Sequence, residues 1–164
     1  MIVRMEIIGI MSGTSLDGCD FAHVKFNDSE GLTSFELLNS HTFPYNIDLQ
    51  KKLKKSPTLS GLEISYLNKE LGGFFSECTN EFIKIKQIAH KNIKAIASHG
   101  HTIFHQPENQ LTLQIGCGQT IAYKTKIDTI NDFRTKDVMA VVDKAHHLFQ
   151  LEILAYSRIW LMDF

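Results

Sequence analysis

Apolar and polar residues alternate with the period of β-strands over the first quarter of the chain. An apolar run at residues 6–11 leads into a turn rich in glycine and hydroxyl groups, and Phe21–Phe26 alternates on the far side of that turn. A turn cluster at Asn27–Gly31 separates this segment from a third run, Leu32–Phe43, which ends before Pro44. The pattern predicts three adjacent antiparallel strands, of which the first two form a hairpin around the glycine turn.

The middle of the chain has helical periodicity. A basic helix is predicted from about Ile47 to Lys55, and Ser60 followed by Glu63 is the capping-box signature of a longer helix. Gly72 and Gly73 weaken the prediction of that second helix, because glycine lowers helix propensity. Its apolar positions have the spacing of one buried helical face, which indicates core packing. They are Leu67, Leu71, Phe74, Phe75, Cys78 and Phe82.

Strands and a helix alternate in the second half of the chain. Ile93–Ala97 is predicted to be a strand that runs into the polar segment Ser98–Thr102. Leu111–Gly116 is predicted to be a strand that leads into a helix at about Gln119–Thr125, and Ile127–Asn131 a further strand. This order indicates an α/β sheet, in which ligands bind at the carboxyl ends of strands, so we expect the polar clusters to share one cleft.

Composition is that of an ordinary globular domain. The chain has 164 residues, of which 43% are hydrophobic and 21% charged, enough for one domain with a core. Its 17 Lys and Arg residues nearly balance 18 Asp and Glu residues, which gives no electrostatic footprint for nucleic acid or a membrane surface. A small polar or anionic ligand is therefore favoured.

The amino-terminal residues and the cysteines indicate a cytoplasmic protein. Residues 1–8 are apolar but are broken by Arg4 and Glu6, so they are interpreted as a buried strand and not as a signal peptide or membrane span. The cysteines are odd in number, far apart and without C-x-x-C pairing, which argues against a disulfide framework or a zinc knuckle. They are Cys19, Cys78 and Cys117.

The segment from Gly9 to Asp20 has the chemistry of a phosphate-binding turn. Its glycines can bring backbone N–H groups close to an anion and adopt positive φ, its hydroxyls can donate further hydrogen bonds, and Asp17 or Asp20 could hold a hydrated cation. No lysine follows as in a P-loop, and the spacing is not that of a nucleophile elbow. A tight hairpin with incidental hydroxyls stays the alternative.

Three histidines and a carboxylate–guanidinium pair are further candidates for site residues. His99, His101 and His105 could in principle ligate zinc, but no acidic or cysteine partner accompanies them, so histidines that orient a ligand or their own loop are favoured. Asp132 and Arg134 follow a predicted strand as a carboxylate and a guanidinium, with a solvated turn pair as the alternative.

Four motifs resemble the anhydro-N-acetylmuramic acid kinase family in order and spacing over residues 6–138. They are MSGTSLDG at Met11–Gly18, SHG-T-FHQP at Ser98–Pro107, LQIG at Leu113–Gly116 and NDFRTKDV at Asn131–Val138. The resemblance implies an α/β fold with a mixed sheet flanked by helices. It would be the N-terminal domain of the ribonuclease H-like superfamily of sugar kinases, actin and Hsp70, in which two α/β domains close over ATP and Mg²⁺.

The resemblance also implies an activity. Such kinases cleave the 1,6-anhydro bond of anhydro-N-acetylmuramic acid while phosphorylating O6, which gives N-acetylmuramic acid 6-phosphate in peptidoglycan recycling. The expected partners are ATP and this amino sugar, without nucleic acid or membrane, in the cytoplasm, and full-length members could form homodimers. The general base is expected in a C-terminal half that this chain lacks.

Site residues follow by the same resemblance. The ATP phosphate loop would comprise Gly13, Thr14, Ser15, Leu16, Asp17, Gly18, Cys19 and Asp20, with Asp17 and Asp20 as weak candidates for Mg²⁺. The sugar side would comprise His99, Gly100, His101, Asp132 and Arg134. Two positions depart from the family pattern: His101 stands where glutamine is usual, and Cys117 where an acidic or amide residue often follows LQIG.

The resemblance stops after Val138. The family continues with GGQGAP, whereas this chain reads VDKAHH at Val142–His147. The codons GGT GGA CAA GGC GCA CCA encode GGQGAP. Without their first base, and with a T following, they read GTG GAC AAG GCG CAC CAT, which encodes VDKAHH. We therefore expect an incomplete kinase domain at residues 1–138 and an out-of-frame tail at residues 139–164. A real helix docked on the sheet is the alternative.

A kinase fragment of this kind is expected to be inactive alone. The other candidates are a non-catalytic nucleotide-binding half-domain and an inert pseudogene product.

Overall fold

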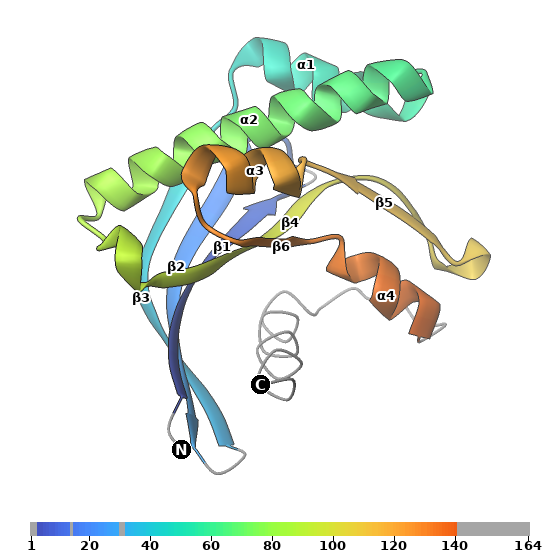
Figure 1. Ribbon diagram of the computed structural model, residues 1–164. Coiled ribbons are helices and arrows are strands. Elements are labelled where there is room, and N and C mark those ends of the chain that lie inside the picture. Colours follow the sequence, from blue (N-terminus) through green and yellow to red (C-terminus); the bar gives the residue numbers. More distant parts are fainter. Residues whose placement is uncertain (1–2, 14, 30–31, 141–164) are drawn as a thin grey trace.

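A computed structural model of the chain describes residues 3–13, 15–29 and 32–140 (Figure 1). It begins with three antiparallel strands, β1 (Val3–Ser12), β2 (Gly18–Ser29) and β3 (Leu32–Pro44). The alternation of the sequence sets their register, with Ile8 opposite His23 and Phe21 opposite His41. The predicted hairpin and third strand are confirmed.

Two helices follow the third strand. Helix α1 (Ile47–Lys55) begins at Asn46, whose side chain accepts the backbone N–H of Leu49 at 2.8 Å. Helix α2 (Gly61–Ile85) begins at the predicted capping box: the Ser60 side chain accepts the Glu63 N–H, and the Glu63 carboxylate accepts the Ser60 N–H. These reciprocal bonds satisfy two of the amide groups that a helix start leaves without partners.

The long strand β4 (Ile93–Gln106) has two parts with different partners. Its first part runs parallel to β1 and to β6 (Thr129–Asn131). Its second part pairs antiparallel with β5 (Leu111–Ile115). The hydrogen-bonded order is β3-β2-β1-β4-β5, with β6 also paired to β4, so the sheet is mixed.

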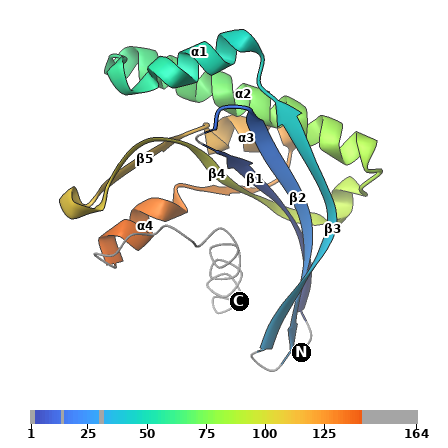
Figure 2. The same cartoon turned by 180° about the vertical axis from the view of Figure 1, so that it is seen from behind.

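Among the described residues, three helices cover one face of this sheet, and a fourth lies on the other. Helices α1, α2 and α3 (Gly118–Thr125) lie on one side, and α4 (Phe133–Ala140) lies on the opposite side of β4 and β5 (Figures 1 and 2). The larger core cluster joins the helix-covered face of β1, β2 and β4 to the buried stripe of α2. A smaller cluster on the other face contains Ile7, Val24, Phe26 and Ala97.

The two glycines inside α2 have different surroundings. A Cβ on Gly72 would lie 2.8 Å from the carbonyl oxygen and 2.9 Å from the backbone nitrogen of Cys117, whereas one on Gly73 would meet only the Lys124 amine at 3.5 Å. Gly72 therefore permits close contact between α2 and the turn at Cys117. The stripe predicted for α2 is confirmed, and of the two glycines that weakened the prediction this contact explains Gly72.

The polar segment Ser98–Thr102 was expected at the end of a strand, and this expectation is wrong. The strand continues through it to Gln106. Gly100 has a φ of +74°, and a Cβ there would collide with the carbonyl of Ile115. Glycine at this position lets β4 bend out of its parallel pairing and into the hairpin with β5. Helix α4 was also not predicted.

No helix within the described ranges is long and apolar enough to cross a membrane. The tail expected to be out of frame falls almost wholly on residues 141–164, which lie outside the described residues.

Candidate functional site

The polar clusters of the sequence begin at one level of the sheet, after β1, within β4 and after β6. The register places Ile10 of β1 opposite Ser98 of β4, and Ser98 opposite Asn131 of β6. Three segments therefore begin at or just after this row of paired residues. They are the glycine turn after β1, the histidine segment of β4 and the Asp132 turn after β6. The carboxyl ends of β1 and β6 lie here, and α/β sheets bind ligands at the carboxyl ends of their strands.

The glycine turn is a tight reversal between β1 and β2. The backbone N–H of Leu16 donates to the carbonyl of Gly13 at 3.4 Å, and Leu16 has a φ of +59°. The sequence suggested that the glycines would take the left-handed conformation, but within the described part of the turn it is Leu16 that does. Ser15 and Asp17 are exposed, and the Ser15 hydroxyl donates to the Asp17 carboxylate at 2.6 Å.

Gly18 fixes the base of this turn against β3. A Cβ on Gly18 would overlap the carbonyl group of Phe43, so only glycine fits between these strands. One residue before Gly18, the Asp17 carbonyl accepts the backbone N–H of Tyr45 at 3.2 Å. The Ser15 hydroxyl lowers the pKa of Asp17, so this exposed side chain is a carboxylate at neutral pH.

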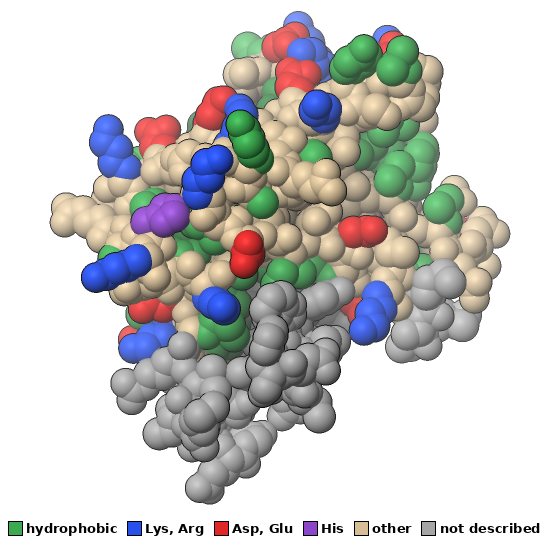
Figure 3. Space-filling model, viewed as in Figure 1, with side chains coloured by type: hydrophobic (Ala, Val, Ile, Leu, Met, Phe, Trp, Pro, Cys, Tyr) green, Lys and Arg blue, Asp and Glu red, His purple; other side chains and the backbone are tan. Residues whose placement is uncertain are grey.

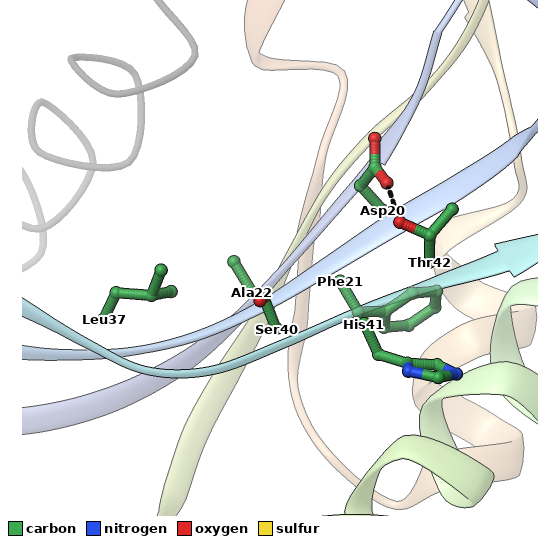
Figure 4. A pocket seen from close by; sticks show the side chains of 7 residues that line it. All are labelled: Asp20, Phe21, Ala22, Leu37, Ser40, His41 and Thr42. Atoms are coloured by element: carbon green, nitrogen blue, oxygen red, sulfur yellow. Dashed lines mark hydrogen bonds between the residues drawn. The ribbon is translucent and has the colours of Figure 1, made fainter.

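Asp20 lies on β2, one strand position beyond the buried Cys19. The Asp20 carboxylate accepts the Thr42 hydroxyl of β3 at 2.5 Å, and both side chains line a shallow pocket of about 290 Å³ (Figure 4). In that view they point toward each other from adjacent strands. Asp20 thus stands at an open surface with one carboxylate oxygen held by its neighbour.

Cys19 faces the core and not the turn surface. It is fully buried, and contact with the Cys78 thiol of α2 together with burial raises the pKa of Cys19. Cys19 is therefore a neutral thiol inside the core, paired on both sides within the sheet.

His99 and Arg134 connect β4 to the start of α4. Nε2 of His99 lies 3.1 Å from the Arg134 guanidinium, and Nδ1 lies 3.1 Å from the carbonyl of Gly100. Arg134 also donates to the Thr102 hydroxyl at 3.4 Å. Burial lowers the pKa of His99; the Gly100 carbonyl opposes this shift, and the positive charge of Arg134 adds to it.

His101 lies on the same strand but contacts a different partner. Its Nδ1 is 2.8 Å from the Ser12 hydroxyl, and both side chains are buried. Burial and the proximity of His99 lower the pKa of His101, so the ring is neutral. His105 lies further along β4, where its Nδ1 is 3.3 Å from the Thr112 hydroxyl. The three histidines of the sequence motif therefore do not converge on one point.

Asp132 precedes α4 in a left-handed conformation with a φ of +59°. Its carboxylate accepts the Thr135 hydroxyl at 2.6 Å within the first turn of that helix. Asp132 is exposed, whereas Arg134 is half-buried between α4 and β4.

Asn68 of α2 holds the turn after β5. Its side-chain oxygen accepts the Gly116 N–H at 2.7 Å, and its backbone carbonyl accepts the Cys117 N–H at 3.0 Å. Burial raises the pKa of Cys117, but hydrogen bonds from Thr120 and Gln119 and the charge of Lys69 outweigh this effect and lower it. The thiol of Cys117 is thus more acidic than usual at the start of α3.

The surface of the helices α1 and α2 carries charges of both signs. Lys, Arg, Asp and Glu side chains are interspersed over the visible surface of α1 and α2 (Figure 3). Among the described residues, no group of three or more His, Cys, Asp or Glu side chains is placed to hold a metal ion.

Comparison with known proteins gives the family. The sequence model of the family described as anhydro-N-acetylmuramic acid kinase matches residues 5–146. The chain belongs to the anhydro-N-acetylmuramic acid kinase family.

Relatives with that name come from several bacteria. The protein of Caldanaerobacter subterraneus subsp. tengcongensis is 41% identical over 145 residues, which cover 82% of this chain and 37% of the relative. That of Francisella tularensis subsp. novicida is 36% identical, with 91% and 41% covered, and that of Vibrio cholerae serotype O1 is 39% identical, with 84% and 38% covered. The chain thus spans about two fifths of the length of the kinases it matches.

The family match includes every residue that the sequence assigned to a site. Of the phosphate-loop candidates, Gly13 and Ser15–Asp20 form the described turn and the start of β2, while Thr14 lies outside the described residues. His99, Gly100 and Arg134 lie together, and Asp132 is exposed nearby in the chain.

Sequence reasoning missed Asn68 and Thr102, both of which support the family motifs through hydrogen bonds. Thr102 falls inside the SHG-T motif, which could have singled it out. Asn68 is an ordinary polar position of a helix, and its only signal is Gly72 one turn later, which marks the close contact.

Proposed function

We propose that this chain provides the ATP phosphate-binding part of an anhydro-N-acetylmuramic acid kinase, within a ribonuclease H-like domain of the sugar kinase, actin and Hsp70 superfamily. The β1–β2 turn carries the proposal, because it exposes the Ser15 hydroxyl and the Asp17 carboxylate at the carboxyl end of β1, where the sheet order favours a ligand. The parallel pairing of β1, β4 and β6 beside three antiparallel strands supports the superfamily.

ATP and Mg²⁺ fit the residues of the turn. Exposed Asp17 offers an ionised carboxylate for a hydrated cation. The exposed Ser15 hydroxyl, which donates to Asp17 in this structure, could turn to donate to a phosphate oxygen. Mg²⁺ keeps several waters and is usually held by one or two carboxylates together with substrate phosphates, so a third acidic residue is unnecessary. Asp17 is the stronger candidate, and Asp20 the second.

The turn would hold the phosphates of ATP in place and stabilise their negative charge. Backbone N–H groups of Gly13–Gly18 would donate to phosphate oxygens and stabilise the negative charge of phosphoryl transfer. Mg²⁺ supplies charge neutralisation between the phosphates when bound. Asp17 and Asp20 each accept a neighbouring hydroxyl and suit a cation better than the role of general base.

The sugar side of the site is proposed at His99, Gly100 and Arg134, with Asp132 beside them. Arg134 is oriented by His99 and Thr102, so its guanidinium is fixed in place. A carboxylate such as that of a muramic acid suits such a fixed guanidinium. The whole reaction, cleavage of the 1,6-anhydro bond with phosphorylation of O6, is proposed for the longer kinases to which this chain corresponds.

Binding and turnover by the 164-residue chain separate the candidate functions. We expect saturable, Mg²⁺-dependent binding of ATP, measured by titration calorimetry, and no transfer of radiolabelled phosphate to anhydro-N-acetylmuramic acid. Transfer would show that the chain is an enzyme by itself. Absence of both would favour an inert product and contradict the proposal.

One variant of the turn and one control test the role of the turn in that binding. Asp17→Asn should weaken the Mg²⁺ dependence of ATP binding. Ser65→Ala is the matched control, because the Ser65 hydroxyl is exposed on α2 and bonds only its own helix at the Gly61 carbonyl.

A further inference from the structure

A buried hydrogen bond connects the phosphate turn to the histidine segment. The Ser12 hydroxyl and Nδ1 of His101 are 2.8 Å apart, with 3% and 4% of the two residues exposed. The two residues are also partners in the pairing of β1 with β4, at the point where the register shifts after Ile10. The bond therefore lies where the two strands begin to diverge.

The position of the bond in the chain gives it a particular consequence. Ser12 is the last residue of β1 and directly precedes Gly13, so its side chain fixes the entry to the turn. The residues on either side of Gly100 and His101 have another partner. His99 and Thr102 both accept hydrogen bonds from the Arg134 guanidinium. One strand segment thus holds the phosphate turn on one side and Arg134 on the other.

We propose that His101 is a positioning residue, which sets the phosphate turn through Ser12 and ties it to the segment that orients Arg134. This inference rests on the proposed function and replaces a sugar contact as the role of His101. An imidazole with 4% exposure, already bonded to a hydroxyl, has no surface to offer to a sugar.

The chemistry of the pair indicates which substitution should preserve it. A hydroxyl can donate to an unprotonated ring nitrogen or accept from a protonated one, and a neutral imidazole offers either. A glutamine amide offers the same choice at similar reach. His101→Gln should therefore keep the bond, whereas His101→Ala and Ser12→Ala remove it.

Amide hydrogen exchange of the turn tests the inference without any ligand. In the 164-residue chain, His101→Ala and Ser12→Ala should each raise the exchange rate of the Gly13–Gly18 amides about five-fold, the factor expected for one net hydrogen bond. The double variant should show no further rise, because both substitutions break the same bond. His101→Gln should behave like the unchanged chain.

A second buried histidine provides the control. His23 is also 4% exposed, and its ring bonds Glu6 and Asn39 in the same sheet, away from the turn. His23→Ala should destabilise the chain and leave exchange of the turn amides unchanged relative to the rest of β1 and β2. An equal rise in the turn for His23→Ala, or none for His101→Ala, would overturn the inference.

Affinity for Mg·ATP gives an independent readout. The dissociation constant should rise about five-fold in His101→Ala and Ser12→Ala and return in His101→Gln. If the unchanged chain binds no ATP, the proposed function fails, and the exchange rates still decide whether His101 positions the turn.

Discussion

The guanidinium of Arg134 donates a hydrogen bond to Nε2 of His99 at 3.1 Å, so this nitrogen carries no proton. The other ring nitrogen, Nδ1, then carries the hydrogen and donates to the Gly100 carbonyl at 3.1 Å. Only the neutral ring with its proton on Nδ1 satisfies both contacts. Burial lowers the pKa of His99, and protonation would also place an N–H group against the Arg134 guanidinium, so this histidine stays neutral.

Stability should therefore fall as the solution becomes acidic. The pKa values of His99 and His101 lie below the ordinary value of 6.5 in the folded chain, so below pH 6.5 the unfolded chain binds more protons. The free energy of unfolding, measured by urea denaturation, should be level above about pH 7 and decrease as the pH drops through 6.5.

A double variant tests the source of this pH dependence. His99→Gln with His101→Gln should flatten the decrease between pH 7 and pH 5.5, because glutamine does not titrate. An unchanged slope in the double variant would assign the effect to other groups.

The adjacent glycines of α2 should respond oppositely to alanine. Gly72→Ala should lower the free energy of unfolding by about 2 kcal/mol, since its Cβ would overlap the backbone of Cys117. Gly73→Ala has room and should raise it by about 0.5–1 kcal/mol through helix propensity. Denaturation of both variants measures the contrast, and equal effects would mean that α2 does not approach Cys117 so closely.

The capping box of α2 should contribute measurably to stability. Ser60→Ala removes the acceptor of the Glu63 N–H and should cost about 1 kcal/mol of unfolding free energy. Ser65→Ala, in the second turn of the same helix, should change it little, because its hydroxyl bonds only the Gly61 carbonyl. A cost as large for Ser65→Ala would point to a general effect of serine in this helix.

Much of this fold could be predicted because its signals are local. The alternation of β1–β3, the capping box at Ser60 and the stripe of α2 depend on neighbours within a few residues, and all appear in the structure. The length of β4 could not be predicted in this way. It depends on Gly100, whose positive φ lets the strand continue into a hairpin with β5.

The candidate site was predictable as a set of motifs but not as a set of contacts. The register that aligns Ser98 with Ile10 and Asn131 follows from parallel pairing between segments far apart in the sequence. The bond from Ser12 to His101 spans 89 positions, and no local pattern encodes it. His101 thus looks like a ligand-binding residue in the sequence, although its side chain is buried against Ser12 at the end of β1.

The reading frame after Val138 is a separate prediction. We expect the gene to carry, across Val142–His147, nucleotides that encode GGQGAP when one base is restored upstream. The nucleotide sequence of the gene checks this directly. Codons that cannot encode GGQGAP in the shifted frame would favour a tail that belongs to the protein as translated.

Above all, we propose that the Gly13–Asp20 turn binds the phosphates of ATP. Titration of the ¹⁵N-labelled 164-residue chain with Mg·ATP, followed by the amide resonances, tests it most directly. We expect saturable shifts concentrated at residues 13–20, with the amides of α1 and the α2 carboxyl end unchanged. Shifts confined to other residues, or none at ATP concentrations that saturate longer kinases of the family, would contradict it.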